Sequence, residues 1–91
     1  MRVPAEVLKW INAERKAMGR PAIRAMMKGT YYTSSNSCPI ATSLGRNGVR
    51  VVPNGYYWPK HVKFVPFPDF MKAFELDINR GLYPQLLGAK E

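Results

Sequence analysis

The sequence predicts an α+β fold with three N-terminal helices, a small antiparallel β-hairpin or sheet, and one C-terminal helix. Apolar side chains recur at helical spacing before residue 45 and after residue 68, and prolines and glycines stand at the ends of these segments. Between them, an Asn-Gly pair joins a valine-rich run to an aromatic run, which is a strong hairpin signal. A chain of 91 residues is expected to form a single small domain, residues 1–91, around one core.

The first two helices are expected to follow one another with only a short turn between them. Residues 4–19 carry an amphipathic pattern that starts at a proline and ends at a glycine, and these residue types favour the two ends of a helix. Residues 21–28 repeat the arrangement between Pro21 and Gly29, with isoleucine and methionine side chains as the apolar face. The sequence therefore predicts two consecutive helices and then a polar loop over residues 30–37.

The third helix is predicted by the stretch NSCPIATSLG, residues 36–45, which holds the only cysteine of the chain. Ser37 or Cys38 would cap this helix, the following proline fits its first turn, and the closing glycine ends it. A helix N-terminus lowers the pKa of a thiol, but a catalytic thiol also needs a general base, and His61 is the only histidine. Because nothing in the sequence brings Cys38 and His61 together, we expect a buried structural cysteine, no catalytic residue and no enzymatic activity.

The hairpin is expected to pair residues 49–52 with residues 56–58 across a turn at Asn54 and Gly55. Residues 61–65 either resume the strand or lie along an edge, since the proline before them cannot donate to a sheet ladder.

The last helix is expected to open at Pro68 and Asp69 and to stop at Gly81, with phenylalanine and methionine side chains at helical spacing. The tail behind this helix is expected to dock through Leu82 and Leu86.

The charge of the chain is strongly asymmetric. The formal net charge is +8, and no acidic residue occurs between Glu14 and Asp69. Nine basic residues lie in that interval: Arg15, Lys16, Arg20, Arg24, Lys28, Arg46, Arg50, Lys60 and Lys63. Such an excess favours an anionic partner, and the alternative is that it only maintains solubility.

Other classes of site and location are disfavoured. One cysteine and one histidine without a metal-ligand spacing predict no metal site, and the absence of a glycine-rich phosphate loop predicts no nucleotide cofactor. No apolar run approaches the roughly 20 residues that cross a bilayer, so no membrane role is expected. A single cysteine and an N-terminus without a secretory signal favour a cytoplasmic protein.

Basic and aromatic residues occur near one another in two parts of the chain. Arg20, Arg24 and Lys28 recur every four residues and would share one face of the second helix. The residues expected to contact nucleic acid are Arg20, Arg24, Lys28, Arg46, Arg50, Lys60 and Lys63. The rings expected to contact a partner are Tyr31, Tyr56, Tyr57 and Trp58. Rings among cations suit single-stranded nucleic acid, and the alternative for each ring is a place in the core.

Duplex DNA is a second option, because three helices followed by a hairpin is the element order of a winged helix-turn-helix domain. In that arrangement residues 37–44 would be the recognition helix and residues 49–58 the wing. That helix offers only Thr42 and Ser43 to base edges.

The chain follows the pattern C-P-[IV]-A-x-x-L from Cys38 to Leu44, and a second short motif closes with Gly81-Leu82-Tyr83-Pro84. These two motifs resemble sequences of small orphan proteins from actinobacteria and their bacteriophages. The resemblance covers roughly residues 37–85 and implies an accessory protein, directed at the host or at nucleic acid, in the cytoplasm of the host cell.

Taken with the charge pattern, this resemblance leads to the hypothesis of a non-catalytic phage-type accessory protein that binds nucleic acid, with DNA favoured over RNA. The alternative is a module that binds and modulates an acidic host protein through an aromatic and basic patch. The sequence leaves a homo-oligomer open.

Overall fold

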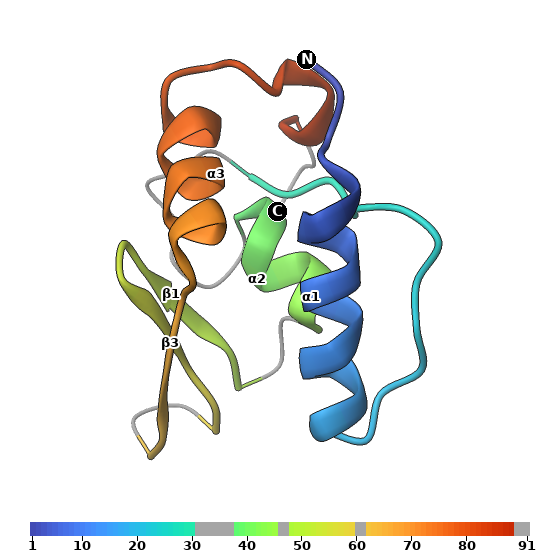
Figure 1. Ribbon diagram of the computed structural model, residues 1–91, viewed down its shortest axis with the longest axis vertical. Coiled ribbons are helices and arrows are strands. Elements are labelled where there is room, and N and C mark those ends of the chain that lie inside the picture. The colour runs from blue at the N-terminus through green and yellow to red at the C-terminus, as the bar shows by residue number, and fades with distance from the viewer. Residues whose placement is uncertain (31–37, 46–47, 60–61, 89–91) are drawn as a thin grey trace.

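The structure is a computed structural model that describes residues 1–30, 38–45, 48–59 and 62–88. Its helices are α1 (Ala5–Ala17), α2 (Pro39–Leu44), α3 (Asp69–Asn79) and the short 3-10 helix η1 (Pro84–Leu86). The strands β1 (Arg50–Val52), β2 (Gly55–Tyr57) and β3 (Phe64–Pro66) form one antiparallel sheet in the order β1-β2-β3. Figure 1 shows α2 between α1 and α3, with the sheet below α3.

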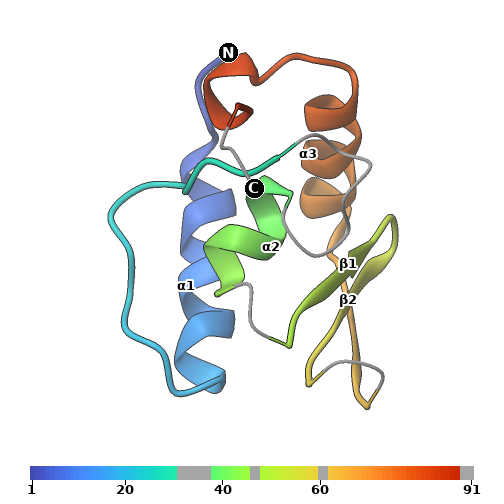
Figure 2. The ribbon, with the colours of Figure 1, turned by 180° about the vertical axis from the view of Figure 1, so that it is seen from behind.

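The prediction of three N-terminal helices and one C-terminal helix is wrong, because residues 21–28 form no helix. Two α-helices precede the sheet and one follows it, and the sheet has three strands. Residues 20–30, which we call the strap, instead run along the outer side of α1 (Figures 1 and 2).

Side chains of the neighbouring helices explain why the strap is not helical. Asn12 of α1 donates its amide hydrogen to the carbonyl of Ile23 at 3.0 Å and accepts from the backbone N–H of Ile23 at 2.8 Å. Ser43 of α2 accepts from the backbone N–H of Met27 at 2.9 Å. A helix of eight residues is marginal by itself, and here its backbone groups find partners elsewhere, so the extended conformation is favoured.

The first and third predicted helices are confirmed with small changes at their ends. α1 begins after Pro4 and ends at Ala17, close to the expected range 4–19. α2 begins after Cys38, whose Sγ accepts from the backbone N–H of Ala41 at 3.4 Å, and it ends at Gly45 with φ +129°. Only glycine adopts this backbone angle without strain, which is why the helix stops there.

The predicted hairpin is also confirmed, with a change in the turn. Val52 pairs with Gly55, so Pro53 and Asn54 form the loop and Gly55 already belongs to β2. β3 then pairs with β2, with Tyr56 opposite Val65, and lies at the edge of the sheet. It begins at Phe64, later than the expected range 61–65, and residue 61 lies outside the described residues.

The C-terminal helix α3 begins after Pro68, as expected, and its C-cap is Arg80, directly before the expected stop at Gly81. The tail docks through Leu86, which is buried, whereas Leu82 is exposed. The carbonyl of Leu86 accepts from the backbone N–H of Gly29 at 2.8 Å, and this bond ties the end of the strap to the tail.

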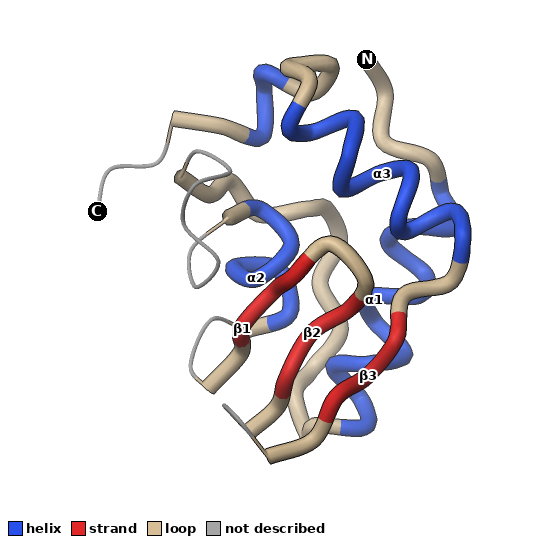
Figure 3. The backbone as a smooth tube through the Cα atoms, turned by 90° about the vertical axis from the view of Figure 1, so that its left-hand side faces the viewer, coloured by secondary structure: helices blue, strands red, loops and turns tan. Residues whose placement is uncertain are grey.

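The core lies between the helices and the inner face of the sheet. Its fully buried side chains come from α1, α2 and α3, and Val49 and Val51 contribute from the sheet side. Trp10 of α1 meets Tyr56 and Phe67 edge to face, with ring centroids 6.1 and 5.5 Å apart. Figure 3 shows that no described helix covers the opposite, outer face of the sheet.

Candidate nucleic-acid interface

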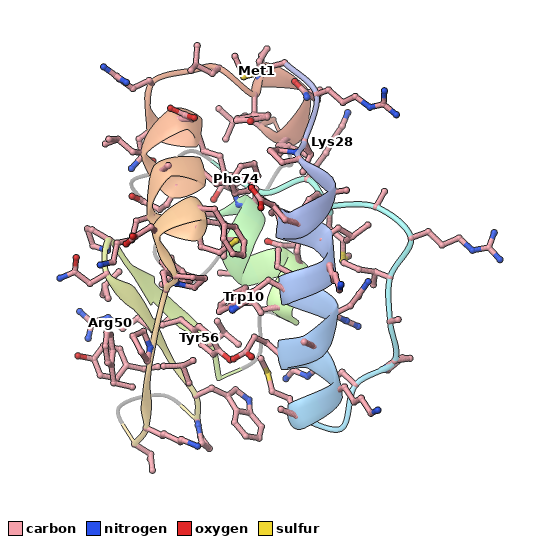
Figure 4. All side chains as sticks on the ribbon, viewed as in Figure 1. Met1, Trp10, Lys28, Arg50, Tyr56 and Phe74 are labelled. Atoms are coloured by element: carbon pink, nitrogen blue, oxygen red, sulfur yellow. The ribbon has the colours of Figure 1, made fainter. Side chains whose placement is uncertain are left out.

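The described members of the basic set expected to bind nucleic acid do not converge on one face. Arg46 and Lys60, and with them Tyr31, lie outside the described residues. The other five form two groups, with Arg20, Arg24 and Lys28 on the strap and Arg50 and Lys63 at the sheet. Figure 4 shows Lys28 beside the start of α1 and Arg50 at the sheet on the other side of the molecule. A single continuous basic face is therefore absent among these five residues.

Arg15 and Arg20 are part of the folded framework. Arg15 is only 9% exposed, and its guanidinium donates to the carbonyl of Pro21 at 2.7 Å and to the carbonyl of Ser43 at 2.8 Å. Arg20 is half-buried and donates to the carbonyl of Leu44 at 2.7 Å, in the last turn of α2. A cation at this position satisfies a carbonyl that the helix itself leaves without a partner.

The three rings of the hairpin have three different environments. Tyr56 is 2% exposed, and its hydroxyl donates to Glu14 Oε1 at 2.6 Å, so it belongs to the core and not to a partner-binding surface. Trp58 is half-buried and packs against the edge of the core. Tyr57 is half-buried on the outer face of the sheet. Of these rings, Tyr57 is the one positioned to meet a ligand on that face.

Three side chains form a row across the outer face of the sheet. The register pairs Arg50 with Tyr57 and Tyr57 with Phe64, and residues paired in this way project from the same face. The Arg50 guanidinium carbon lies 5.9 Å from the centroid of the Tyr57 ring, and the Tyr57 and Phe64 centroids are 5.2 Å apart. We call Arg50, Tyr57 and Phe64 the outer row.

Phe64 is the member of the outer row that the sequence did not single out. Its side chain is 41% exposed, which is unusual for a phenylalanine. The ring lies over Gly55, where a Cβ atom would come within 2.8 Å of Phe64 Cζ and 2.2 Å of the carbonyl oxygen of Val65. The signal that could have found Phe64 is the strand register, because pairing β3 with β2 places it opposite Tyr57.

Cys38 lies in an environment that suppresses thiol chemistry. The residue is 8% exposed, and burial raises the pKa of the Cys38 thiol although backbone N–H groups of the helix N-terminus act to lower it. Glu75 raises this pKa further by charge repulsion of the thiolate. His61, the only candidate for a partner base, lies outside the described residues.

Two further site classes can be compared with the structure. Within residues 1–30, 38–45, 48–59 and 62–88, no three or more metal-ligating side chains group together. In the same residues, none of the helices combines the length and apolar character needed to span a bilayer.

Because residues 21–28 form no helix, the chain lacks the helix that would precede the recognition helix of the predicted winged helix-turn-helix arrangement.

Comparisons with known proteins returned no match for this chain. No protein-family model matches it, and neither the curated proteins nor the solved structures include a significant match. The resemblance to small phage and actinobacterial proteins accordingly stays a prediction that these comparisons do not test.

Proposed function

We propose that this chain is a non-catalytic accessory protein that binds single-stranded nucleic acid on the outer face of its sheet. The observation that carries the proposal is the outer row: a cation, a tyrosine and a phenylalanine in neighbouring register on a face that no described helix covers. Single strands are bound in this way elsewhere, by bases that stack on aromatic rings and phosphates that pair with cations.

Each member of the outer row has a distinct role in this proposal. Phe64, the most exposed ring, stacks on one base, and Tyr57 stacks on a neighbouring one. Arg50 lies over Tyr57 and contacts a phosphate with the guanidinium edges that the ring does not cover. Lys63 is exposed, directly precedes Phe64 and adds a second cation for the backbone.

Single strands suit this surface better than duplexes. The strands are three residues long, so the face is small and carries no helix that could enter a major groove. A row of rings gains contact only with bases that are already unpaired. DNA and RNA both offer unpaired bases. The expected preference for DNA is tested by comparing the affinities for a DNA and an RNA oligonucleotide of the same sequence.

Fluorescence anisotropy of dye-labelled single-stranded oligonucleotides, titrated with the protein at low salt, tests the proposal. Tyr57→Ala and Phe64→Ala are each expected to weaken binding about tenfold, because a base stacked on a ring contributes about 1–3 kcal/mol. Leu76→Ala is the matched control, since Leu76 is an apolar side chain 54% exposed that belongs to α3 and not to the sheet. Its affinity is expected to equal that of the unmodified protein.

Two results would overturn the proposal. One is the absence of binding to single-stranded DNA and RNA at low salt. The other is equal loss of affinity in Leu76→Ala and in the two ring variants, because the effect would then not originate at the outer row.

A further inference from the structure

A groove with a volume of about 520 Å³ lies where the N-terminal segment, the strap and η1 meet. Its floor is aliphatic and includes Val3, Leu8, Met26 and Leu86. Leu86 is buried, and Val3 and Met26 pack against the core, so this floor is held in place by the fold. A volume of this size can hold a side chain and the backbone around it.

The rim of the groove is cationic. Arg2, Arg24 and Lys28 line it and are exposed, and none of the described residues that line it is acidic. Within the described parts of the chain the structure shows one ion pair, Lys72 with Asp69, so none of the three rim cations is neutralised there. The first turn of α1 also opens onto the groove through Ala5 and adds the positive end of the helix dipole.

We propose that this groove binds a short acidic segment of a partner polypeptide. One aliphatic side chain of the segment occupies the floor, and carboxylates on either side of it meet Arg2, Arg24 and Lys28. The site is distinct from the outer row, and the proposal does not rest on nucleic-acid binding. Figure 4 shows Lys28 near the start of α1 and Arg50 at the sheet, which places the two surfaces on different sides of the molecule.

The chemistry of the groove favours a polypeptide over a nucleic acid. None of the described residues that line it is aromatic, so bases would find no ring among these residues on which to stack. Aliphatic side chains in the floor match an aliphatic side chain of the ligand, while the rim cations match carboxylates.

A second copy of this chain is a poor occupant, because the acids of the described residues lie on α1 and α3 and not in an extended segment, and two of them already accept hydrogen bonds within the chain. Glu14 accepts from the Tyr56 hydroxyl, Asp69 pairs with Lys72, and Glu75 accepts from Asn79. The acidic segment is therefore expected to come from a different protein.

The test uses a dye-labelled peptide in which one leucine stands between two pairs of glutamates, titrated with the full chain by fluorescence anisotropy. Arg24→Glu and Lys28→Glu are each expected to raise the dissociation constant about tenfold, since a like charge then faces the peptide. Ala25→Trp, at an exposed position that lines the groove, is expected to abolish binding by filling it. Lys9→Glu is the matched control, because Lys9 is an exposed cation of α1 outside the groove.

Peptide variants and an oligonucleotide complete the test. A peptide with glutamine in place of every glutamate, or with alanine in place of leucine, is expected to bind at least tenfold more weakly. Equal binding of the glutamine peptide, or equal loss of affinity in Lys9→Glu and Arg24→Glu, would overturn the proposal. Loss of oligonucleotide binding in Ala25→Trp, without loss of peptide binding, would overturn it as well. Tyr57→Ala is expected to leave peptide affinity unchanged, so a failure at this groove is distinguishable from a failure at the outer row.

Discussion

The guanidinium group of Arg15 joins three segments of the chain. It projects from α1 and donates to a carbonyl of the strap, at Pro21, and to a carbonyl of α2, at Ser43. A planar group with several fixed donors can serve two acceptors at once, which lysine cannot do in the same geometry. Its burial is accordingly compensated by hydrogen bonds to main-chain oxygens.

Arg15→Met is therefore expected to lower the free energy of unfolding by about 2–4 kcal/mol, because two carbonyls lose a charged donor while the aliphatic packing is kept. Lys16→Met is the control, since Lys16 is the adjacent cation and is exposed. Its effect is expected to stay within about 0.5 kcal/mol. Urea denaturation monitored by tryptophan fluorescence measures both values, and equal stability of the two variants would contradict the role assigned to Arg15.

The buried Cys38 thiol and Tyr56 hydroxyl are expected to make the stability of the folded state decrease at alkaline pH. Burial raises the pKa of each, and the Glu14 carboxylate raises that of Tyr56 further. The folded state favours the neutral form of each side chain, because its pKa in the folded state lies above its unfolded pKa, which is about 8.5 for cysteine and about 10 for tyrosine. The stability that each neutral side chain contributes is therefore complete below the unfolded pKa and is lost as pH rises from the unfolded pKa toward the folded one. The free energy of unfolding is expected to fall by up to about 1.4 kcal/mol per pH unit for each group.

Cys38→Ala and Tyr56→Phe separate these two contributions. Urea denaturation at pH values from about 7 to 11 is expected to give a shallower alkaline decline for each variant than for the unmodified protein. The Cys38→Ala difference should begin near the ordinary thiol pKa and the Tyr56→Phe difference at higher pH. Parallel curves for all three proteins would contradict the raised pKa values.

At the scale of elements, the strap depends on side chains that reach it from the helices. Asn12→Ala removes both hydrogen bonds to Ile23 and is expected to lower the free energy of unfolding by about 1–3 kcal/mol. Hydrogen exchange at the Ile23 amide is expected to accelerate. Asn79→Ala is the matched control, because the Asn79 amide bonds only Glu75 within α3 in the structure, and a small effect is expected. Similar exchange at Ile23 in both variants would show that Asn12 does not hold the strap.

The elements that could be predicted are those whose signals are local. Cys38 as cap, Pro39 in the first turn and Gly45 as stop define α2 within a few residues, and these contacts stay inside the helix or next to it. The strap could not be predicted, because its conformation depends on Asn12 and Ser43, which are distant in sequence. Its apolar spacing alone is compatible with a helix.

The candidate site could be predicted only in part for a similar reason. Arg50 and Tyr57 were expected from composition, but charge and aromaticity do not tell a core ring such as Tyr56 from a surface ring. Phe64 becomes a candidate only once the register of β3 against β2 is known. With this register known, Arg50, Tyr57 and Phe64 can be recognised together as the outer row.

For the whole molecule, the basic residues serve at least three purposes. Arg15 and Arg20 bond main-chain carbonyls, Arg24 and Lys28 line the groove, and Arg50 lies on the outer row. The net charge of +8 is therefore distributed over several parts of the molecule and does not belong to one binding face. It still attracts anionic partners at long range, while the local contacts decide where each partner binds.

Salt dependence distinguishes these surfaces. In a plot of the logarithm of affinity for a single-stranded oligonucleotide against the logarithm of salt concentration, each phosphate contact contributes about 0.7 to the slope, because it releases a counterion. Arg50→Gln is expected to reduce the slope by about that amount. Arg24→Gln, which removes an exposed cation on the other side of the molecule, is expected to leave the slope unchanged. An equal reduction in both variants would contradict binding confined to the outer row, since nucleic acid would then contact the strap as well as the sheet.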